Sequence, residues 1–218
     1  MKHDLKRKGI LFVLIGPSGS GKSTFCSRLI RDFEDLHYSI SVTSRPPRQG
    51  EVQGTSYHFV SREEFLARRD RGEFFEWEET HGNLYGTLRS TLQNGIDGGH
   101  DLLFQIDIRG ALTMKKHFPD NTVSVFIIPP SFEALRERLV GRGSVDAAEL
   151  ERRFATARQE YEALLSLHGE AAKVDYLLLN EDLEDTYTHM KGIVMAERSR
   201  YLRMDGESVA KFCKVGGS

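Results

Sequence analysis

The stretch ILFVLIGPSGSGKST, from Ile10 to Thr24, places an apolar run directly before a glycine-rich loop. The run is short and continuously apolar, as in a strand that is buried on both faces of a parallel sheet. Phe25, Leu29 and Phe33 then follow at helical spacing, so a helix is expected after the loop. Backbone N–H groups of such a loop, and the helix N-terminus behind it, attract anions. The stretch therefore predicts an α/β fold with a phosphate site at the end of this strand.

Gly16, Gly21, Lys22 and Ser23 match the pattern G-x-x-x-x-G-K-[ST]. In this pattern backbone N–H groups surround the phosphates, the lysine reaches the β- and γ-phosphates, and the hydroxyl binds Mg²⁺. A chance match in a chain of this length has a probability on the order of one per cent, and an ordinary glycine-rich turn is the alternative. We expect the loop to bind a nucleoside triphosphate, with Mg²⁺ on Ser23. The expected binding residues are Gly16, Pro17, Ser18, Gly19, Ser20, Gly21, Lys22, Ser23 and Thr24.

Composition and charge limit the remaining possibilities. The chain has 218 residues, 39% hydrophobic and 28% charged, which is an ordinary globular composition and predicts one compact unit. A formal charge of −2 gives no overall attraction to nucleic acid or to an anionic membrane, so neither partner is expected. Cys26 and Cys213 give no disulfide framework, and we expect a cytoplasmic protein. The apolar run before the loop is too short for a signal peptide or a membrane span.

Apolar strands and helical patterns alternate along the rest of the chain. DLLFQIDI, TVSVFIIPP and VDYLLLN are predicted to be buried strands, and SREEFLARRDRG a helix that Ser61 opens. This order predicts a parallel sheet core with helices on both faces, interrupted by a mixed α+β insert. The predicted units are a core over residues 1–37, 96–131 and 167–205, the insert over 38–95, a helical segment over 132–166, and a flexible tail over 206–218.

Two stretches of the insert carry polar groups suited to a second phosphate compound. SISVTSRPPRQGEVQGTSYHF contains Arg45 and Arg48 around a stiff Pro-Pro pair, and guanidinium groups are good donors to a dianionic phosphate. A solvated basic loop is the alternative for this stretch. EFFEWEETHGNLYGT follows, with Glu76, Tyr85 and Thr87 outside any clear amphipathic pattern. Because both stretches lie in the insert, we expect them to face one another.

Seven motifs, in order and spacing, make the chain resemble the guanylate kinases from about Gly9 to Arg203: GPSGSGKST, SxxxTSRPPRxGEVxGxxYxFV, EFxEWxxxxGNLYGT, IDIRGA, LxxRLVGRG, ERRF and DYLLLN. The resemblance implies a P-loop nucleoside monophosphate kinase fold, with the insert as a GMP-binding region and residues 132–166 as a helical lid. It implies transfer of the γ-phosphoryl group of ATP to GMP, and also to dGMP, giving ADP and GDP in purine metabolism. Mg²⁺ would bind with ATP, and the enzyme would be a monomer or a homodimer.

The resemblance also implies roles for residues of the insert. Arg45, Arg48, Tyr57 and Tyr85 would hold the phosphate of GMP. Glu76 would accept hydrogen bonds from guanine N1–H and N2–H, whereas adenine has an acceptor at N1, so AMP would be rejected by up to about 10⁴-fold. A surface carboxylate is the alternative for Glu76. The residues implied to bind GMP are Ser41, Arg45, Arg48, Glu51, Tyr57, Glu76, Tyr85, Thr87 and Asp107.

Cations around the transferring group complete the implied site. By the resemblance, Arg138, Arg142 and Arg153 flank a glycine-rich break and close over the triphosphate, while Asn180 contacts adenine. The alternatives are solvated arginines on exposed helices and a turn residue at the end of a strand. The implied catalytic residues are Lys22, Arg45, Arg138 and Arg153, and Arg138, Arg142 and Asn180 join the loop in binding ATP.

One position departs from the family pattern. Guanylate kinases usually have D-x-D where this sequence has Gln105-Ile106-Asp107, and a neutral amide lacks the charge of the first carboxylate. Because Ser23 and the phosphates can still hold Mg²⁺, we expect an active kinase with weaker Mg²⁺ dependence or turnover. Two alternatives stay open. One is a catalytically weak or silent guanylate kinase-like interaction module, and the other is a P-loop kinase of a phosphorylated sugar, against which the polar set of the insert argues.

Overall fold

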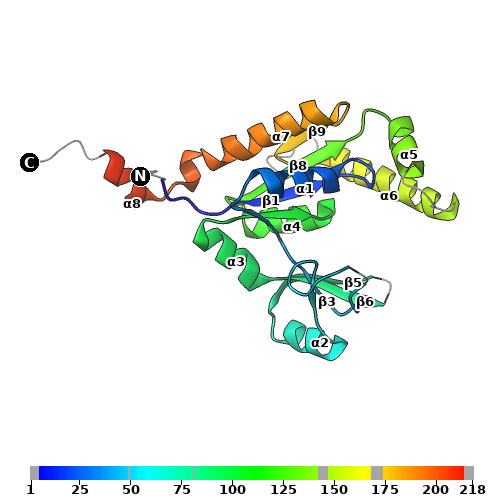
Figure 1. The fold of residues 1–218 in the computed structure, drawn as a ribbon, viewed down its shortest axis with the longest axis horizontal. Helices are drawn as coiled ribbons and strands as arrows, with labels where there is room; N and C mark the ends of the chain where they lie inside the picture. Colours follow the sequence, from blue (N-terminus) through cyan, green and yellow to red (C-terminus); the bar gives the residue numbers. More distant parts are fainter. Residues whose placement is uncertain (1–4, 49, 81, 142–146, 168–173, 214–218) are drawn as a thin grey trace, which may run out of the picture.

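A five-stranded parallel sheet forms the centre of the molecule, and a smaller mixed sheet lies below it in Figure 1. The structure is a computed structural model that describes residues 5–48, 50–80, 82–141, 147–167 and 174–213. The strands of the large sheet have the order β2-β7-β1-β8-β9, and all neighbouring pairs are parallel. They are β1 (Leu11–Ile15), β2 (Leu36–Tyr38), β7 (Asp101–Gln105), β8 (Thr122–Ile128) and β9 (Tyr176–Leu179). The predicted α/β fold with a parallel core is confirmed.

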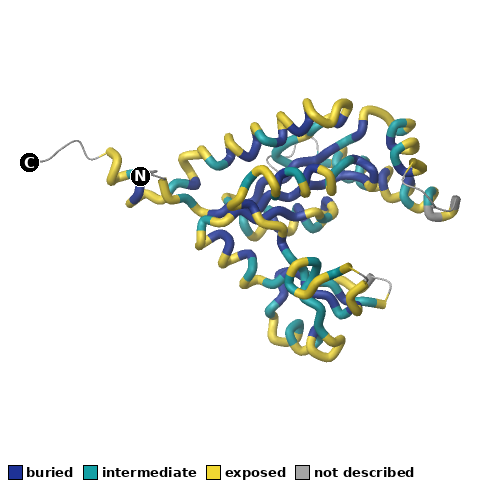
Figure 2. The backbone as a smooth tube through the Cα atoms, viewed as in Figure 1, coloured by how far each residue is buried: buried dark blue, intermediate teal, exposed yellow. Residues whose placement is uncertain are grey.

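β1 occupies the middle of this sheet, and its side chains alternate between two hydrophobic layers. Phe12 and Leu14 pack in one layer, whereas Leu11, Val13 and Ile15 pack in the other, so the strand is buried on both faces (Figure 2). The first layer is covered by α1 (Lys22–Asp32) and α7 (Leu183–Arg198), and the second by α3 (Arg89–Gly98), α4 (Ile108–His117) and α6 (Ala147–Ser166). Of the helices that the structure describes, none has the length and apolar character needed to cross a bilayer.

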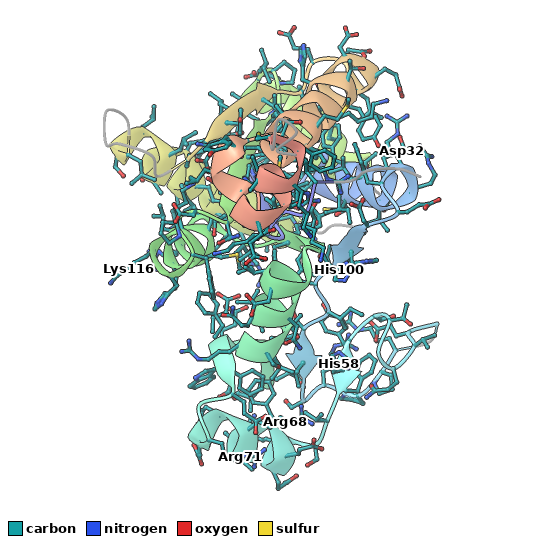
Figure 3. The ribbon with its side chains drawn as sticks, turned by 90° about the vertical axis from the view of Figure 1, so that its left-hand side faces the viewer. Asp32, His58, Arg68, Arg71, His100 and Lys116 are labelled. Carbon is teal, nitrogen blue, oxygen red and sulfur yellow. The ribbon has the colours of Figure 1, made fainter. Side chains whose placement is uncertain are left out.

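Most of the insert forms a layer of its own, joined to the core through α3 (Figures 1 and 3). Its four strands have the order β4-β3-β6-β5 and pack on α2 around the stacked rings of Phe65 and Phe74, whose centroids lie 4.3 Å apart. In Figure 3, Arg68 lies at the far end of this layer, well away from Lys116 of the core. The elements are β3 (Val42–Thr43), β4 (His58–Phe59), α2 (Arg62–Asp70), β5 (Phe74–Thr80) and β6 (Asn83–Leu88).

The predicted helical segment consists of α5 (Phe132–Val140) and α6, at one end of the large sheet (Figure 1). The two helices share a small hydrophobic cluster that includes Leu135, Leu139 and Phe154. Leu135 and Leu139 also lie close to the phosphate loop. A Cβ atom on Gly19 would be 3.0 Å from the Leu135 side chain and 3.2 Å from that of Leu139. The position of α5 is therefore coupled to the loop by direct packing.

The C-terminal segment differs from the prediction of a flexible tail from Gly206. α7 ends at Arg198, a 3₁₀ turn follows at Tyr201–Arg203, and residues Gly206–Cys213 form helix α8. Asp205 opens this helix, because its side chain accepts a hydrogen bond from Ser208 N at 2.7 Å. Ser208 Oγ in turn accepts from Lys6 N at 3.0 Å, which ties the helix to the N-terminal segment beside it (Figure 1). The prediction is therefore wrong for residues 206–213, and residues 214–218 lie outside the described part of the chain.

Candidate active site

The phosphate loop is shaped by glycines that no other residue could replace without strain. Gly16 has φ +129° and Gly21 has φ +103°, both in the left-handed region that favours glycine. A Cβ on Gly16 would lie 2.2 Å from Ile127 O of β8, and one on Gly21 would lie 2.7 Å from Asn180 Nδ2. The loop brings Gly16, Pro17, Ser18, Gly19, Ser20 and Gly21 together before α1, which begins with Lys22, Ser23 and Thr24.

Asn180 supports the loop from the end of β9. Its Nδ2 donates to Ser20 O at 2.8 Å, and Arg138 Nη2 of α5 donates to the Asn180 backbone carbonyl at 2.9 Å. Asn180 is 3% exposed and Ser20 is fully buried. The structure therefore places Asn180 against the phosphate loop, and the predicted adenine contact stays a prediction. Arg138, the predicted lid residue, is joined to the loop through Asn180.

The first residues of α1 carry the polar groups expected to meet the triphosphate. Lys22 Nζ donates to the carbonyls of Gly16 and Pro17, the latter at 2.9 Å, so its ammonium group lies over the loop itself. Ser23 Oγ donates to Gln105 Oε1 at 3.1 Å. Gln105, the residue that differs from the family pattern, therefore lies directly beside the expected Mg²⁺ ligand. Burial raises the pKa of the nearby Cys26 thiol to about 12, so this cysteine is a neutral core residue.

In the insert, Arg45 is the centre of a group of polar side chains. Both of its terminal nitrogens bond Glu51, with Nη1 to Oε2 at 2.9 Å and Nη2 to Oε1 at 2.8 Å. The guanidinium carbon lies 5.5 Å from the centroid of the Tyr57 ring, and Tyr57 lies 6.1 Å from Tyr85, centroid to centroid. Arg45 is only 8% exposed. Three of the residues predicted to hold one phosphate, Arg45, Tyr57 and Tyr85, thus lie together.

Glu51 organises this group. The Arg45 hydrogen bonds, followed by the hydrogen bond from Arg48 N at 2.6 Å, lower the pKa of Glu51 to about 2. The Glu51 hydrogen bonds also raise the pKa of Arg45, with a smaller contribution from Tyr85. Glu51 is therefore ionised throughout the neutral range and fixes the orientation of Arg45. The side chain of Arg48 is exposed at the edge of the group.

Three more of the residues predicted to bind GMP lie where the insert meets α4. Thr87 Oγ1 donates to Glu76 Oε1 at 3.4 Å, and Asp107 opens α4 by accepting from Gly110 N at 2.7 Å. A Cβ on Gly110 would lie 3.4 Å from Glu76 Oε2 and 3.3 Å from Asp107 Oδ1, so the two carboxylates flank one small residue. Burial raises the pKa of Glu76; the Thr87 hydrogen bond opposes this shift, and the charge of Asp107 adds to it.

Ser41, also predicted to bind GMP, lies just before β3 and is half-buried. Its backbone carbonyl accepts from His58 N at 2.9 Å, which holds this residue at the edge of the small sheet. Asp107, by contrast, belongs to the core and lies near Glu76 of the insert. The residues predicted to bind GMP therefore come from two parts of the fold.

The segment predicted to be a lid contributes one group that was not predicted from the sequence. Arg153 is half-buried on α6, as expected for a residue that faces inward, whereas Arg142 lies outside the described residues. Glu160 follows Arg153 by seven positions and therefore shares its face of the helix. Its carboxylate is close enough to Lys22 and Asp107 for both charges to act on it. The seven-residue spacing was the only signal in the sequence that pointed to Glu160.

The oxygen atoms around Lys22 suit a hard cation that keeps most of its water. Ser23 Oγ and Gln105 Oε1 are neutral oxygen donors, and Glu160 Oε2 is buried with no hydrogen-bond partner among the described residues. Within the same part of the chain, no three His, Cys, Asp or Glu side chains gather as a metal cage. Mg²⁺ is commonly bound in this way, by one or two protein oxygens together with phosphates and water. The residues present therefore fit Mg²⁺ that arrives with a nucleotide.

Known proteins resemble the chain over nearly its whole length. The family model described as guanylate kinase matches residues 8–197. A guanylate kinase of Syntrophotalea carbinolica is 44% identical over 204 residues, which are 94% of this chain and 93% of the relative. One of Thermotoga maritima is 41% identical over 196 residues, or 90% of this chain and 91% of the relative. The crystal structure of guanylate kinase from Anaplasma phagocytophilum is similar with a TM-score of 0.69 and 35% identity, covering 95% of this chain and 96% of that one.

Proposed function

This chain belongs to the guanylate kinase family, and we propose how its own residues carry out the reaction of that family. It is an ATP:GMP phosphotransferase, which moves the γ-phosphoryl group of ATP to GMP and releases ADP and GDP. The alternative of a silent interaction module finds no support in relatives that carry an enzyme's name. One observation carries our assignment of residues. The charges of Lys22 in the phosphate loop and of Asp107 at the start of α4 both shift the pKa of one carboxylate, that of Glu160, the first downward and the second upward.

We assign the donor side to the phosphate loop. Its backbone N–H groups and Lys22 bind the phosphates of ATP, and glycine conformations keep the loop in the required shape. Lys22 lies over the loop through its hydrogen bond to Pro17 O at 2.9 Å, which places its ammonium group where the phosphates would bind. When bound, Mg²⁺ would supply positive charge to the phosphates of ATP, and Ser23, with Gln105 beside it, is the residue that we expect to hold it.

We assign the acceptor phosphate to Arg45, with Arg48, Tyr57 and Tyr85 around it. Glu51 fixes Arg45 through two hydrogen bonds of 2.8 and 2.9 Å, so the guanidinium group loses little further freedom when a phosphate binds. The phenol groups add neutral donors beside this cation. Glu51 is in this proposal a positioning residue for Arg45 rather than a ligand of GMP.

Base selection is assigned to Glu76, supported by Thr87, Ser41 and Asp107. Guanine offers adjacent N1–H and N2–H donors, which an ionised carboxylate accepts well. Adenine would place an acceptor lone pair against a half-buried carboxylate, which costs affinity. Because the assigned contacts are to phosphate and base, and none is to the ribose 2′-OH, we propose dGMP as a second acceptor.

The chemical step needs alignment and charge stabilisation rather than a covalent intermediate. A phosphate oxygen of GMP forms a bond to the γ-phosphorus, while the bond from that phosphorus to the bridging oxygen breaks and its electron pair leaves with ADP. Lys22 and Arg45 approach this group from the two sides. We propose that Arg138 and Arg153 of the lid add positive charge over it and exclude water.

Two further properties complete the proposal. Both cysteines are free thiols, which is usual in a reducing compartment, so we propose a cytoplasmic enzyme of purine nucleotide metabolism. The expectation of a monomer or a homodimer stays a prediction.

The experiment that tests the function is an assay of ADP release with MgATP and one acceptor at a time. We expect GMP and dGMP to support turnover, with IMP weaker because it lacks the N2 amino group, and AMP and CMP at background. Equal use of AMP and GMP would remove Glu76 from its assigned role. No ADP release with any guanine nucleotide would contradict the proposed function as a whole.

A further inference from the structure

Glu160 of the lid helix α6 is fixed in place by its neighbours in the chain. Tyr161 and Leu164 pack into the hydrophobic layer below the large sheet, and the Tyr161 ring lies 6.4 Å from that of Phe126 in β8. This packing anchors the middle of α6 to the core. The position of Glu160 on α6 is therefore set by packing of the helix on the core.

The carboxylate of Glu160 is unusual because one of its oxygens is unsatisfied. Oε2 is buried, and among the described residues it has no hydrogen-bond partner. A buried charged oxygen without a partner destabilises the folded protein, so such groups are normally explained by a ligand or by a neighbouring charge. Burial raises the pKa of Glu160, the charge of Lys22 lowers it, and the charge of Asp107 raises it again. The carboxylate of Glu160 therefore lies within electrostatic range of Lys22 in the phosphate loop and of Asp107 at the start of α4.

Position 105 explains why a carboxylate is useful there. Gln105 ends β7 and accepts a hydrogen bond from Ser23 at 3.1 Å, so the residue nearest the expected Mg²⁺ ligand on this strand is neutral. The ammonium group of Lys22 and a hydrated divalent cation would both lie close to the neutral side chain of Gln105. Without an anionic group these positive charges would repel each other before the phosphates neutralise them.

We propose that Glu160 is a positioning residue that supplies, from the lid helix, the negative charge that the neutral Gln105 does not supply at the end of β7. Its carboxylate balances Lys22 and attracts Mg²⁺ through bound water, and so couples Mg²⁺ to nucleotide binding. This inference rests on the proposed function, because it assigns Glu160 a part in the same site. It would also allow Mg²⁺ to be used with a neutral residue at position 105.

The proposal predicts effects of opposite sign on two forms of the same ligand. In the Glu160→Gln variant, metal-free ADP should bind about fivefold more tightly, because an anion near its phosphates has been removed. MgADP should bind about twofold more weakly, because the attraction of the carboxylate for the cation is lost. The ratio of the two dissociation constants, which measures how much Mg²⁺ assists binding, should fall about tenfold. If Glu160 had only a structural role, its substitution would weaken the binding of metal-free ADP and of MgADP together.

The test is calorimetric titration of ADP in excess Mg²⁺ and again in EDTA, with melting temperatures recorded for every variant. Glu162→Gln, an exposed carboxylate on the same helix, is the matched control and should leave the ratio within about twofold of the wild type. Glu160→Asp keeps the charge, so the ratio of the two dissociation constants should stay close to that of the wild type. If Glu160→Asp loses as much as Glu160→Gln, packing rather than charge is responsible and the proposal is overturned.

The Gln105→Asp variant allows a second, independent test of the proposal. Combined with Glu160→Gln, it should restore the ratio to within about threefold of the wild type, because the charge returns from β7. If the two substitutions act independently, Gln105 and Glu160 do not share a role and the proposal fails. A wild type that does not phosphorylate GMP refutes the proposed function instead. A wild type that does so, with Glu160→Gln behaving like Glu162→Gln, refutes only this inference.

Discussion

The phosphate loop and the insert serve one reaction with different kinds of structure. In the loop the groups that we assign to binding belong to the backbone, and glycines such as Gly16 and Gly21 are held against β8 and Asn180 with no room for a side chain. In the insert, side chains hold one another, as Glu51 holds Arg45. A site built from backbone is rigid and tolerates few substitutions. A site built from paired side chains is expected to lose selectivity before it loses its fold.

The largest effect is expected in the loop, from Lys22→Met. This substitution keeps most of the side-chain volume and removes the cation, so kcat should fall about 10³-fold while the melting temperature changes little. Steady-state assays with GMP and thermal unfolding measure the two quantities. A loss in kcat of less than tenfold would contradict the role of Lys22 in phosphoryl transfer.

Gly16→Ala tests the rigidity of the loop. The new Cβ would meet Ile127 O at 2.2 Å at a residue with φ +129°, so the free energy of unfolding should fall by about 3 kcal/mol. Gly72→Ala, in the insert, is the matched control because Gly72 has φ +70° but nothing within 4 Å of the new atom. It should cost about 1 kcal/mol. Denaturant titration measures the free energy of unfolding of both variants. Equal losses would show that the close approach of Gly16 to Ile127 does not contribute to stability.

Glu76→Gln tests selectivity in the insert. The amide would face guanine with a mixed donor and acceptor, so kcat/KM for GMP should fall about 10²-fold while that for AMP does not fall. Glu79→Gln, on the same strand and exposed, should leave both values unchanged. If Glu76→Gln lowers the two activities in parallel, the carboxylate does not read the base.

Glu51→Gln tests whether the paired side chains of the insert act on GMP alone. Arg45 would lose a charge-assisted hydrogen bond of 2.8 Å to Glu51, and its side chain would be held less firmly in one orientation. We expect the KM for GMP to rise about tenfold and the KM for ATP to stay within about twofold. Equal increases in both KM values would mean that the two regions are not separable.

The smallest effect concerns pH. Burial raises the pKa of Glu76 above its ordinary value, so on acidification this carboxylate takes up a proton earlier than an exposed glutamate would. The protonated acid is a poorer acceptor for guanine, and the KM for GMP should therefore rise as the pH falls, by about threefold more than in Glu76→Gln between pH 7 and 5.5. The phosphate of GMP titrates in the same way in assays of the wild type and of Glu76→Gln, so the difference between their KM values reports on Glu76 alone. Parallel profiles would contradict the assignment.

The comparison also shows what a sequence reveals. The run from Ile10 to Thr24 predicted a strand, a loop and a helix, because burial on both faces and glycine spacing are local signals. Ser61 opens α2 as predicted, with its side chain accepting from Glu64 N. The strand predicted over DLLFQIDI ends early, at Gln105, because Asp107 opens the next helix instead of extending the strand.

Elements that depend on distant contacts were not predicted. α3 contains Gly95 and Gly98, which are poor helix formers, yet a Cβ on Gly95 would lie 2.7 Å from Leu102 Cδ1, so close packing on β7 requires the glycine. β5 has a register shift between Phe74 and Glu76, which breaks the alternation that would have identified it as a strand. Glu160 was missed for the same reason, since only the folded chain brings it to Lys22.

The central claim is that the loop and the insert present ATP and GMP to each other for direct transfer. The most direct measurement uses ATP labelled in its γ-phosphate, with GMP and Mg²⁺, and follows where the label goes. The account predicts label in the β-phosphate of GDP, in amounts equal to the ADP formed, and little in inorganic phosphate. Label that appears mainly in inorganic phosphate, or in ADP when AMP replaces GMP, would contradict it.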